Sequence, residues 1–216
     1  MRLVQDVQSL LKASPEVATL LGLKFFANFT DLIGGLFAQI CNNAKVGQIV
    51  RQAYLQDPGL VDLSLHDITE TARRNFEPGG PAAALLFSRG VQAIIAHRVA
   101  HHLWIAGDPD LALAVKAICG RALSTDIHPA AQIGAGIWLD HGLGFVAGET
   151  CVIENDVSIW HNVTLGSTLN DSGNCRHPHL GRGVVIGAGA TLLGGIQIGA
   201  RANIAAGAIV LDDVLP

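Results

Sequence analysis

An apolar residue recurs at every sixth position through the C-terminal part of this chain. The first series reads Ile127, Ile133, Leu139, Phe145, Cys151, Val157, Val163 and Leu169. After a break the second series reads Leu180, Ile186, Leu192, Ile198, Ile204 and Val210. A period of six fits neither an amphipathic helix nor an alternating strand. It is typical of a solenoid in which each repeat supplies one short strand and one turn.

Three such repeats make one triangular coil, and stacked coils make a prism with the apolar residues inside. A small residue follows many of the repeat positions and lets the chain bend sharply at a corner: Gly134, Gly181, Gly187, Gly199 and Ala205. The spacing resembles the left-handed parallel β-helix of the hexapeptide acyltransferases. The handedness that we expect comes from that resemblance.

The repeat is broken between Leu169 and Leu180, where eleven residues stand in place of six. The extra residues must leave the prism, and the polar, turn-rich segment 167–179 has the composition of an external loop. Loops on a rigid scaffold are where binding residues concentrate. This one contains Arg176 and His177.

The sequence of residues 1–124 predicts helices separated by turns that contain proline and glycine. Asp108 before Pro109 indicates a helix N-cap followed by a first-turn proline. We expect the longest helix from about residue 82 to residue 106, because apolar residues follow helical spacing there. The predicted fold class is therefore α+β in two parts: an all-α domain at 1–124, then a left-handed parallel β-helix at 125–216 with one extruded loop.

The composition excludes several kinds of partner. The formal net charge is −4, with Arg and Lys scattered along the chain, whereas a nucleic-acid surface needs a basic stripe. Lys24 and Asp31 interrupt the hydrophobic window 20–40, and each charge costs about 3 kcal/mol at mid-bilayer, so a buried helix is favoured over a membrane span. The four cysteines lack paired spacing and no signal peptide is visible. We expect a cytoplasmic protein.

Histidines raise the question of a metal. Three of them lie on the predicted long helix, where a pair at i, i+4 can chelate: His97, His101 and His102. No carboxylate lies between them as in a zinc protease, and histidines in such a helix are more often surface or packing groups. A metal-dependent β-helix hydratase would place its histidines on the coils, which hold, besides the loop histidines, His128, His141 and His161. We predict no metal site.

Candidate catalytic side chains lie close together in sequence where the solenoid begins. Asp126 and His141 are fifteen residues apart, nearly one circuit of an eighteen-residue coil, so they can share a corner on neighbouring levels. A carboxylate against an imidazole fixes its tautomer and raises its basicity. We predict that His141 is a general base supported by Asp126.

The segments DIHPAAQIGAGIWLDHG, GETCVIENDVSI, VTLG and RHP resemble the serine acetyltransferase family, which makes O-acetylserine for cysteine biosynthesis. The helical half agrees more weakly, through DPGLVDLSLHDI and SRGVQAIIAHRVAHHLW. The resemblance implies an acetyl-CoA-dependent serine O-acetyltransferase whose catalytic residues are His141, Asp126 and Asp140. It implies that Arg176, His177 and Glu149 contribute to substrate binding. It also implies a helical domain that serves oligomerisation and substrate contact.

Acetyl-CoA is a co-substrate in this family, with no permanently bound cofactor, and the resemblance places it along the coils near Gly166, Ala188 and Ala206. The chemistry agrees, because a hydroxyl attacks a thioester only as a base removes its proton. The paired donors of Arg176 suit an amino-acid carboxylate. Taken singly, Asp126, Asp140 and Glu149 can each be structural residues, and it is their joint order and spacing that favours function.

Two departures from the family pattern concern the acceptor. Asn75 stands where the family has an aspartate for the amino group of serine, and a neutral amide cannot pair with an ammonium as a carboxylate does. Leu143 replaces a threonine, and Glu77 can substitute for the missing charge. The alternatives are an O-acetyltransferase for another small hydroxylated acceptor, or a non-catalytic scaffold.

The resemblance also bears on assembly. Prisms of this kind commonly place ligand sites between neighbouring chains, so we expect a homotrimer or, because the helical half is retained, a dimer of trimers. Relatives dock into cysteine synthase through a tail, and we expect no such complex if the natural chain ends at Pro216.

Overall fold

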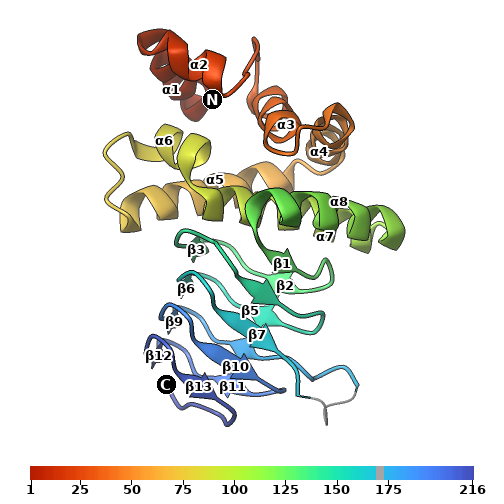
Figure 1. Cartoon of the computed structure of the whole chain (residues 1–216), viewed down its shortest axis with the longest axis vertical. Coiled ribbons are helices and arrows are strands. Elements are labelled where there is room, and N and C mark those ends of the chain that lie inside the picture. Colours follow the sequence, from red (N-terminus) through yellow and green to blue (C-terminus); the bar gives the residue numbers. More distant parts are fainter. Residues whose placement is uncertain (169–172) are drawn as a thin grey trace.

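The computed structural model describes residues 1–168 and 173–216 and divides the chain into a helical half and a prism of short strands (Figure 1). The two halves are stacked end to end, and the C-terminus lies at the far tip of the prism. The helices are α1 Arg2–Ala13, α2 Pro15–Leu20, α3 Phe29–Ile40, α4 Ala44–Gln56, α5 Gly59–Arg74, α6 Gly80–Phe87, α7 Arg89–Ile105 and α8 Pro109–Leu123.

Local sequence explains where several helices begin. Asn28, Asn43 and Asp108 each accept a backbone N–H of the following first turn, and Pro109 occupies the first turn of α8, as predicted. The single long helix expected from residue 82 to residue 106 is wrong. It is two helices, α6 and α7, because Ser88 between them adopts an extended backbone conformation.

The hydrophobic window 20–40 contains α3, whose apolar face is buried in the core. Within the part of the chain that the structure describes, no helix combines the length and the apolar character that crossing a membrane requires.

Every strand of the prism is parallel to its neighbours, and each coil contributes one strand to each of three sheets. Sheet A is β1-β4-β7-β10-β13, sheet B is β11-β8-β5-β2 and sheet C is β12-β9-β6-β3. The predicted fold class, a helical domain followed by a parallel β-helix of hexapeptide repeats, is confirmed. The strands are β1 Asp126–Ile127, β2 Gln132–Ile133, β3 Trp138–Leu139, β4 Val146–Ala147, β5 Val152–Ile153, β6 Ser158–Ile159, β7 Thr164–Gly166, β8 His179–Leu180, β9 Val185–Ile186, β10 Thr191–Leu193, β11 Gln197–Ile198, β12 Asn203–Ile204 and β13 Ile209–Val210.

The strand register corrects the predicted repeat in its middle part. Ile127 pairs with Ala147 and Leu139 pairs with Ile159, so the first coil spans 20 residues, whereas Leu180 and Ile198 are 18 apart. The two extra residues lie between Leu139 and Ala147. The predicted repeat followed the wrong position because each repeat buries two residues: Phe145 is the first of its pair, and Ala147, which pairs with Ile127, is the second.

The interruption of the strand ladder is longer than the sequence count indicated. Leu165 is the last inward strand residue before it and Leu180 is the first after it, because Ile153 pairs with Leu180 and Leu165 with Leu192. Leu169, which the predicted repeat included, lies outside the described residues.

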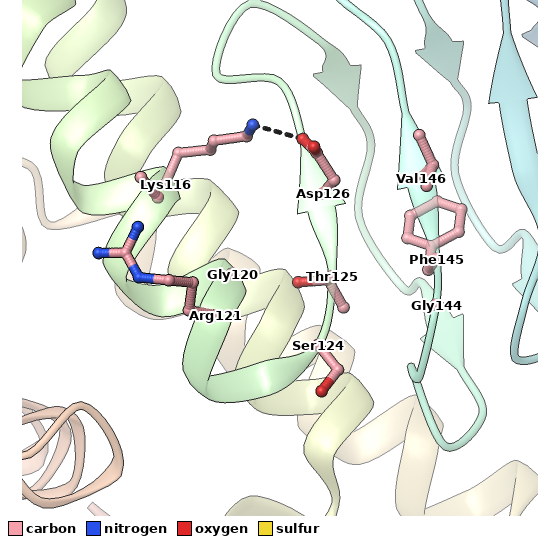
Figure 2. A pocket seen from close by; sticks show the side chains of 10 residues that line it. Lys116, Gly120, Arg121, Ser124, Thr125, Asp126, Gly144, Phe145 and Val146 are labelled. Carbon is pink, nitrogen blue, oxygen red and sulfur yellow. Dashed lines mark ion pairs between the residues drawn. The ribbon is translucent and has the colours of Figure 1, made fainter.

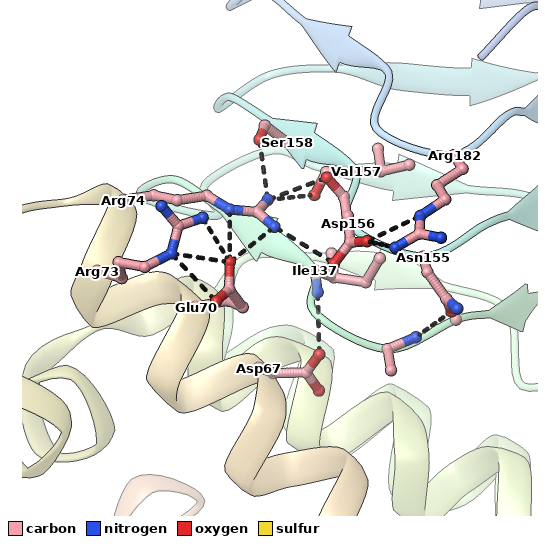
Figure 3. Close-up of polar contacts among 12 residues, drawn as sticks. Asp67, Glu70, Arg73, Arg74, Ile137, Asn155, Asp156, Val157, Ser158 and Arg182 are labelled. Carbon is pink, nitrogen blue, oxygen red and sulfur yellow. Dashed lines mark hydrogen bonds and ion pairs between the residues drawn. The ribbon is translucent and has the colours of Figure 1, made fainter. Parts of the chain in front are cut away.

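A polar junction joins the helices to the first two coils (Figure 3). Asp67 of α5 accepts from the Arg98 side chain of α7 at 2.6 Å and from the Ile137 backbone N–H at 3.0 Å. Arg74, at the end of α5, donates to the Asp156 carbonyl and to the Ser158 hydroxyl, each at 3.1 Å. These contacts set the position of the helices over the top of the prism.

Candidate active site

The path of the chain gives the prism three corners, which we name by the sheets they join. A coil runs from sheet A to sheet B, then to sheet C, then back to sheet A. The C–A corner therefore holds Asp140 and His141, and the A–B corner holds Glu149, Arg176 and His177. The predicted site residues thus lie at opposite ends of the short strands of sheet A.

His141 occupies the two-residue excess of the first coil. Its backbone is left-handed, with φ of 59°, and Gly142 and Gly144 on either side of Leu143 have φ of 74° and 67°. This tight excursion leaves the His141 side chain 64 % exposed, with Nε2 at 3.2 Å from the Asp140 carboxylate. The carboxylate of Asp140, a predicted catalytic residue, therefore lies beside the predicted base.

Asp126 shares the C–A end of sheet A with His141, as the spacing predicted, but the expected contact between them is wrong. The Asp126 carboxylate pairs with Lys116 of α8 (Figure 2). Among the described residues no hydrogen bond or ion pair joins Asp126 to His141. Both Lys116 and Asp126 line an open pocket of about 450 Å³ between α8 and the first coils, which reaches the His141 turn through Gly144.

His161 is a further coil histidine, for which the sequence predicts no role. It lies one coil below His141 at the same corner, and the two rings meet edge to face with their centres 5.4 Å apart. Its Nδ1 is buried without a hydrogen-bond partner in the described structure.

The residues predicted to lie near acetyl-CoA divide between two corners. Ala188 and Ala206 continue the column below His161, since Gly189 donates to the His161 carbonyl and Gly207 to the Ala188 carbonyl. A Cβ atom at Gly189 or Gly207 would meet nothing within 4 Å, so this column has open space beside it. Gly166 instead ends β7, on the A–B side.

The A–B corner holds a dense polar cluster. Arg176 forms an ion pair with Glu149 from the coil above, and this hydrogen bond holds the pKa of the Glu149 carboxyl below its usual range. Thr150, which sequence reasoning missed, contacts the backbone of both Arg176 and His177 and the ring of His177. No sequence signal distinguishes Thr150 from the other hydroxyl residues of the coils.

Asn75 lies away from both of these corners within one chain. It is the C-cap of α5, and its Nδ2 donates to Glu77 at 3.4 Å. Its neighbour Arg74 reaches Asp156 and Ser158 at the start of β6, which is the B–C corner. One chain does not bring Asn75 together with His141.

The histidines of α7 have other surroundings. His101 contacts the Pro129 carbonyl, and His97 is buried, which lowers its pKa well below the ordinary value. Over residues 1–168 and 173–216, the side chains form no group of three or more His, Cys, Asp or Glu that could hold a metal ion.

Comparison with known proteins identifies the family. The family model "Bacterial transferase hexapeptide (six repeats)" matches residues 177–212. The serine acetyltransferase of Buchnera aphidicola is 37 % identical over 220 residues, which cover 99 % of this chain and 80 % of that protein. The chain belongs to the serine acetyltransferase family. It is therefore an enzyme.

Solved members of the serine acetyltransferase family have the same fold. One in complex with CoA is 36 % identical, with a TM-score of 0.88 and coverage of 98 % of this chain and 91 % of its own. The soybean serine acetyltransferase complexed with serine is 36 % identical, with a TM-score of 0.87 and coverage of 99 % and 90 %.

Proposed function

We propose that this enzyme transfers the acetyl group of acetyl-CoA to the hydroxyl of L-serine, with His141 as general base. The observation that carries the proposal is the exposed His141 imidazole, held beside Asp140 on a left-handed turn at the head of an open column. It is supported by the relatives solved with CoA and with serine.

The contact with Asp140 selects the basic nitrogen. A carboxylate only accepts hydrogen bonds, so the His141 Nε2 facing it carries the hydrogen and Nδ1 keeps its lone pair. Nδ1 takes the hydroxyl proton as the serine oxygen attacks the thioester carbonyl. The tetrahedral intermediate then collapses, the C–S bond breaks, and the imidazolium returns its proton to the leaving thiolate. A positioned base contributes about 10²–10⁴-fold to such a step.

The acceptor is held by the A–B cluster. Arg176 and His177 suit the serine carboxylate, with Glu149 orienting the guanidinium. The coenzyme lies along the C–A column, near Ala188 and Ala206, and Gly166 contributes from the A–B end of the sheet A strands.

A site that uses both corners takes them from two chains, because one prism holds His141 and Arg176 at opposite ends of the sheet A strands. This favours a homotrimer in which each acceptor site lies between neighbouring prisms. The helical half, whose first helices lie far from the prism, is then available to join two trimers (Figure 1).

A second acceptor is favoured by one observation. Asn75 is neutral, and its amide already donates to Glu77, so it offers an ammonium no charge. Another small hydroxylated acceptor that lacks an amino group would not need a negative charge at position 75.

Release of the CoA thiol with L-serine and a panel of other small alcohols tests the proposal. We expect turnover with L-serine, and about a 10²–10⁴-fold loss of kcat in His141→Asn. Turnover only with another alcohol supports the second acceptor. No turnover across the panel would overturn the enzymatic assignment of this site.

A mixing experiment tests the shared site. Co-expression of His141→Asn with Arg176→Ala makes about one quarter of the interfaces wild type on both sides, if chains assort at random. We expect activity near that fraction, although each variant alone is inactive. Mixed trimers without activity would contradict a site shared between chains.

A further inference from the structure

Thr150 makes four polar contacts with Arg176 and His177, which precede β8. Its hydroxyl oxygen lies 3.1 Å from the backbone nitrogen of Arg176 and 3.1 Å from that of His177. The same hydroxyl lies 2.8 Å from Nδ1 of the His177 ring. The Thr150 backbone N–H donates to that Nδ1 at 3.2 Å. One residue therefore holds the backbone and the imidazole of the predicted substrate-binding pair.

The donor count determines the protonation of His177. A hydroxyl has one hydrogen to donate and two lone pairs that accept. Both lone pairs of the Thr150 oxygen are used by the backbone N–H groups of Arg176 and His177, so its hydrogen points to Nδ1. Because Nδ1 accepts from this hydroxyl and from the Thr150 N–H, it carries no proton, and the neutral ring carries its hydrogen on Nε2.

The ring is also fixed from its other side. A Cβ atom at Gly148 would lie 1.9 Å from His177 Nε2 and 2.0 Å from its Cδ2. The imidazole therefore packs against the Gly148 backbone, where only glycine leaves room. Together, the two donors at Nδ1 and the absence of a side chain at Gly148 leave the ring one orientation.

We propose that Thr150 is a positioning residue for the acceptor: it holds His177 as the neutral tautomer with hydrogen on Nε2, so that His177 donates to the acceptor carboxylate next to Arg176. This rests on the proposed function, whose acceptor site it deepens. It also gives His177 and His141 different roles. His177 has no lone pair available for a hydroxyl proton, so it serves as a donor, and proton removal stays with His141.

Thr150→Val and Thr150→Ser form a matched pair. Valine keeps the shape and the backbone N–H but removes the hydroxyl, and serine restores it. We expect Thr150→Val to raise KM for L-serine about tenfold, with little change in kcat or in KM for acetyl-CoA, because the pair that holds the carboxylate loses three hydrogen bonds. Thr150→Ser should return KM to within about twofold of wild type. An unchanged KM in Thr150→Val, or equal losses in both variants, would overturn the proposal.

A second readout does not depend on turnover. The ¹⁵N shifts of the His177 ring report its tautomer, assigned with His177→Gln as the reference. We expect hydrogen on Nε2 in the wild type and in Thr150→Ser, with a larger Nδ1–H fraction in Thr150→Val. Hydrogen on Nδ1 in the wild type would overturn the proposal even if serine is acetylated. If serine is not acetylated, the proposed function fails, and this measurement still decides the role of Thr150.

Discussion

Gly90 lies so close to Leu139 that a Cβ atom at position 90 would stand 1.7 Å from the Leu139 carbonyl oxygen. Gly142 approaches the same point, since its own Cβ would lie 3.0 Å from the Gly90 Cα. Leu139 directly precedes Asp140 and His141. The first turn of α7 therefore packs on the backbone that carries the candidate base.

We expect Gly90→Ala to push α7 away from this turn. Overpacking against backbone costs about 1–3 kcal/mol of unfolding free energy, and the displaced turn should also lower kcat. Gly35→Ala in α3 is the control, because its Cβ would meet only Leu23 at 3.9 Å. Urea unfolding and CoA-release assays measure both effects. A Gly90→Ala enzyme with wild-type kcat would show that the His141 turn does not depend on α7.

Asp67 and Arg98 form an ion pair with side chains 0 % and 4 % exposed. Removing one member of a buried pair leaves the other charge uncompensated, so we expect Asp67→Asn to lose about 3–5 kcal/mol of unfolding free energy. Arg73→Ala, which breaks an exposed pair with Glu70, should leave the unfolding midpoint unchanged. Equal midpoints for the two variants would contradict the junction as the structure has it.

Acid should destabilise the fold through His97. Burial, with the nearby charges of His101 and Arg98, lowers the pKa of His97 well below 6.5, so below that pH the unfolded chain binds a proton that the folded chain does not. His97 therefore lowers the free energy of unfolding only below about pH 6.5. There the free energy of unfolding falls with decreasing pH, by up to about 1.4 kcal/mol per pH unit for this residue.

Urea unfolding of the wild type and of His97→Phe between pH 5 and pH 8, at fixed protein concentration, measures this contribution. Phenylalanine keeps an aromatic ring in the core and removes the titrating group. We expect its unfolding free energy to depend less on pH below 6.5. A variant with the slope of the wild type would assign the acid sensitivity to other groups.

The fold class was predictable because hexapeptide periodicity is a property of sequence alone, and residues such as Ile186, Ile198 and Ile204 hold their register in the structure. The register near His141 could not be predicted from the sequence. Both Phe145 and Ala147 are buried, so apolar character does not distinguish them, and only the pairing of Ala147 with Ile127 reveals the two extra residues.

The candidate site was predictable as a set of residues but not as a set of contacts. The spacing correctly placed Asp126 at the same corner as His141, but the Asp126 carboxylate forms an ion pair with Lys116 of α8. The repeat pattern contains no information about a helix that packs beside the first coil. Thr150 was missed because a hydroxyl has no signature until the chain that it binds, 26 residues later in sequence, returns to it.

The cysteines test the burial of the inward coil positions. Cys175 is exposed and Cys41 half-buried, with the pKa of the Cys41 thiol lowered by its hydrogen bond with Cys119, whose Sγ lies 3.6 Å away. Burial raises the pKa of Cys151 to about 12. We expect iodoacetamide at pH 7.5 to label Cys175 and then Cys41, and to reach Cys119 and Cys151 only in urea, as read by peptide mass mapping. Early labelling of Cys151 would place it outside the prism.

Asn75→Asp tests the acceptor directly. If position 75 of a neighbouring chain faces the amino group of serine, a carboxylate pairs with the ammonium where the amide cannot, and KM for L-serine should fall about tenfold with kcat little changed. Glu77→Gln is the companion variant, because Glu77 accepts from Asn75 and can already supply that charge. A raised KM in Glu77→Gln, with no gain in Asn75→Asp, would assign the ammonium to Glu77. If neither variant changes KM, the helical half does not contact the acceptor, and selection for serine lies with Arg176 and His177 alone.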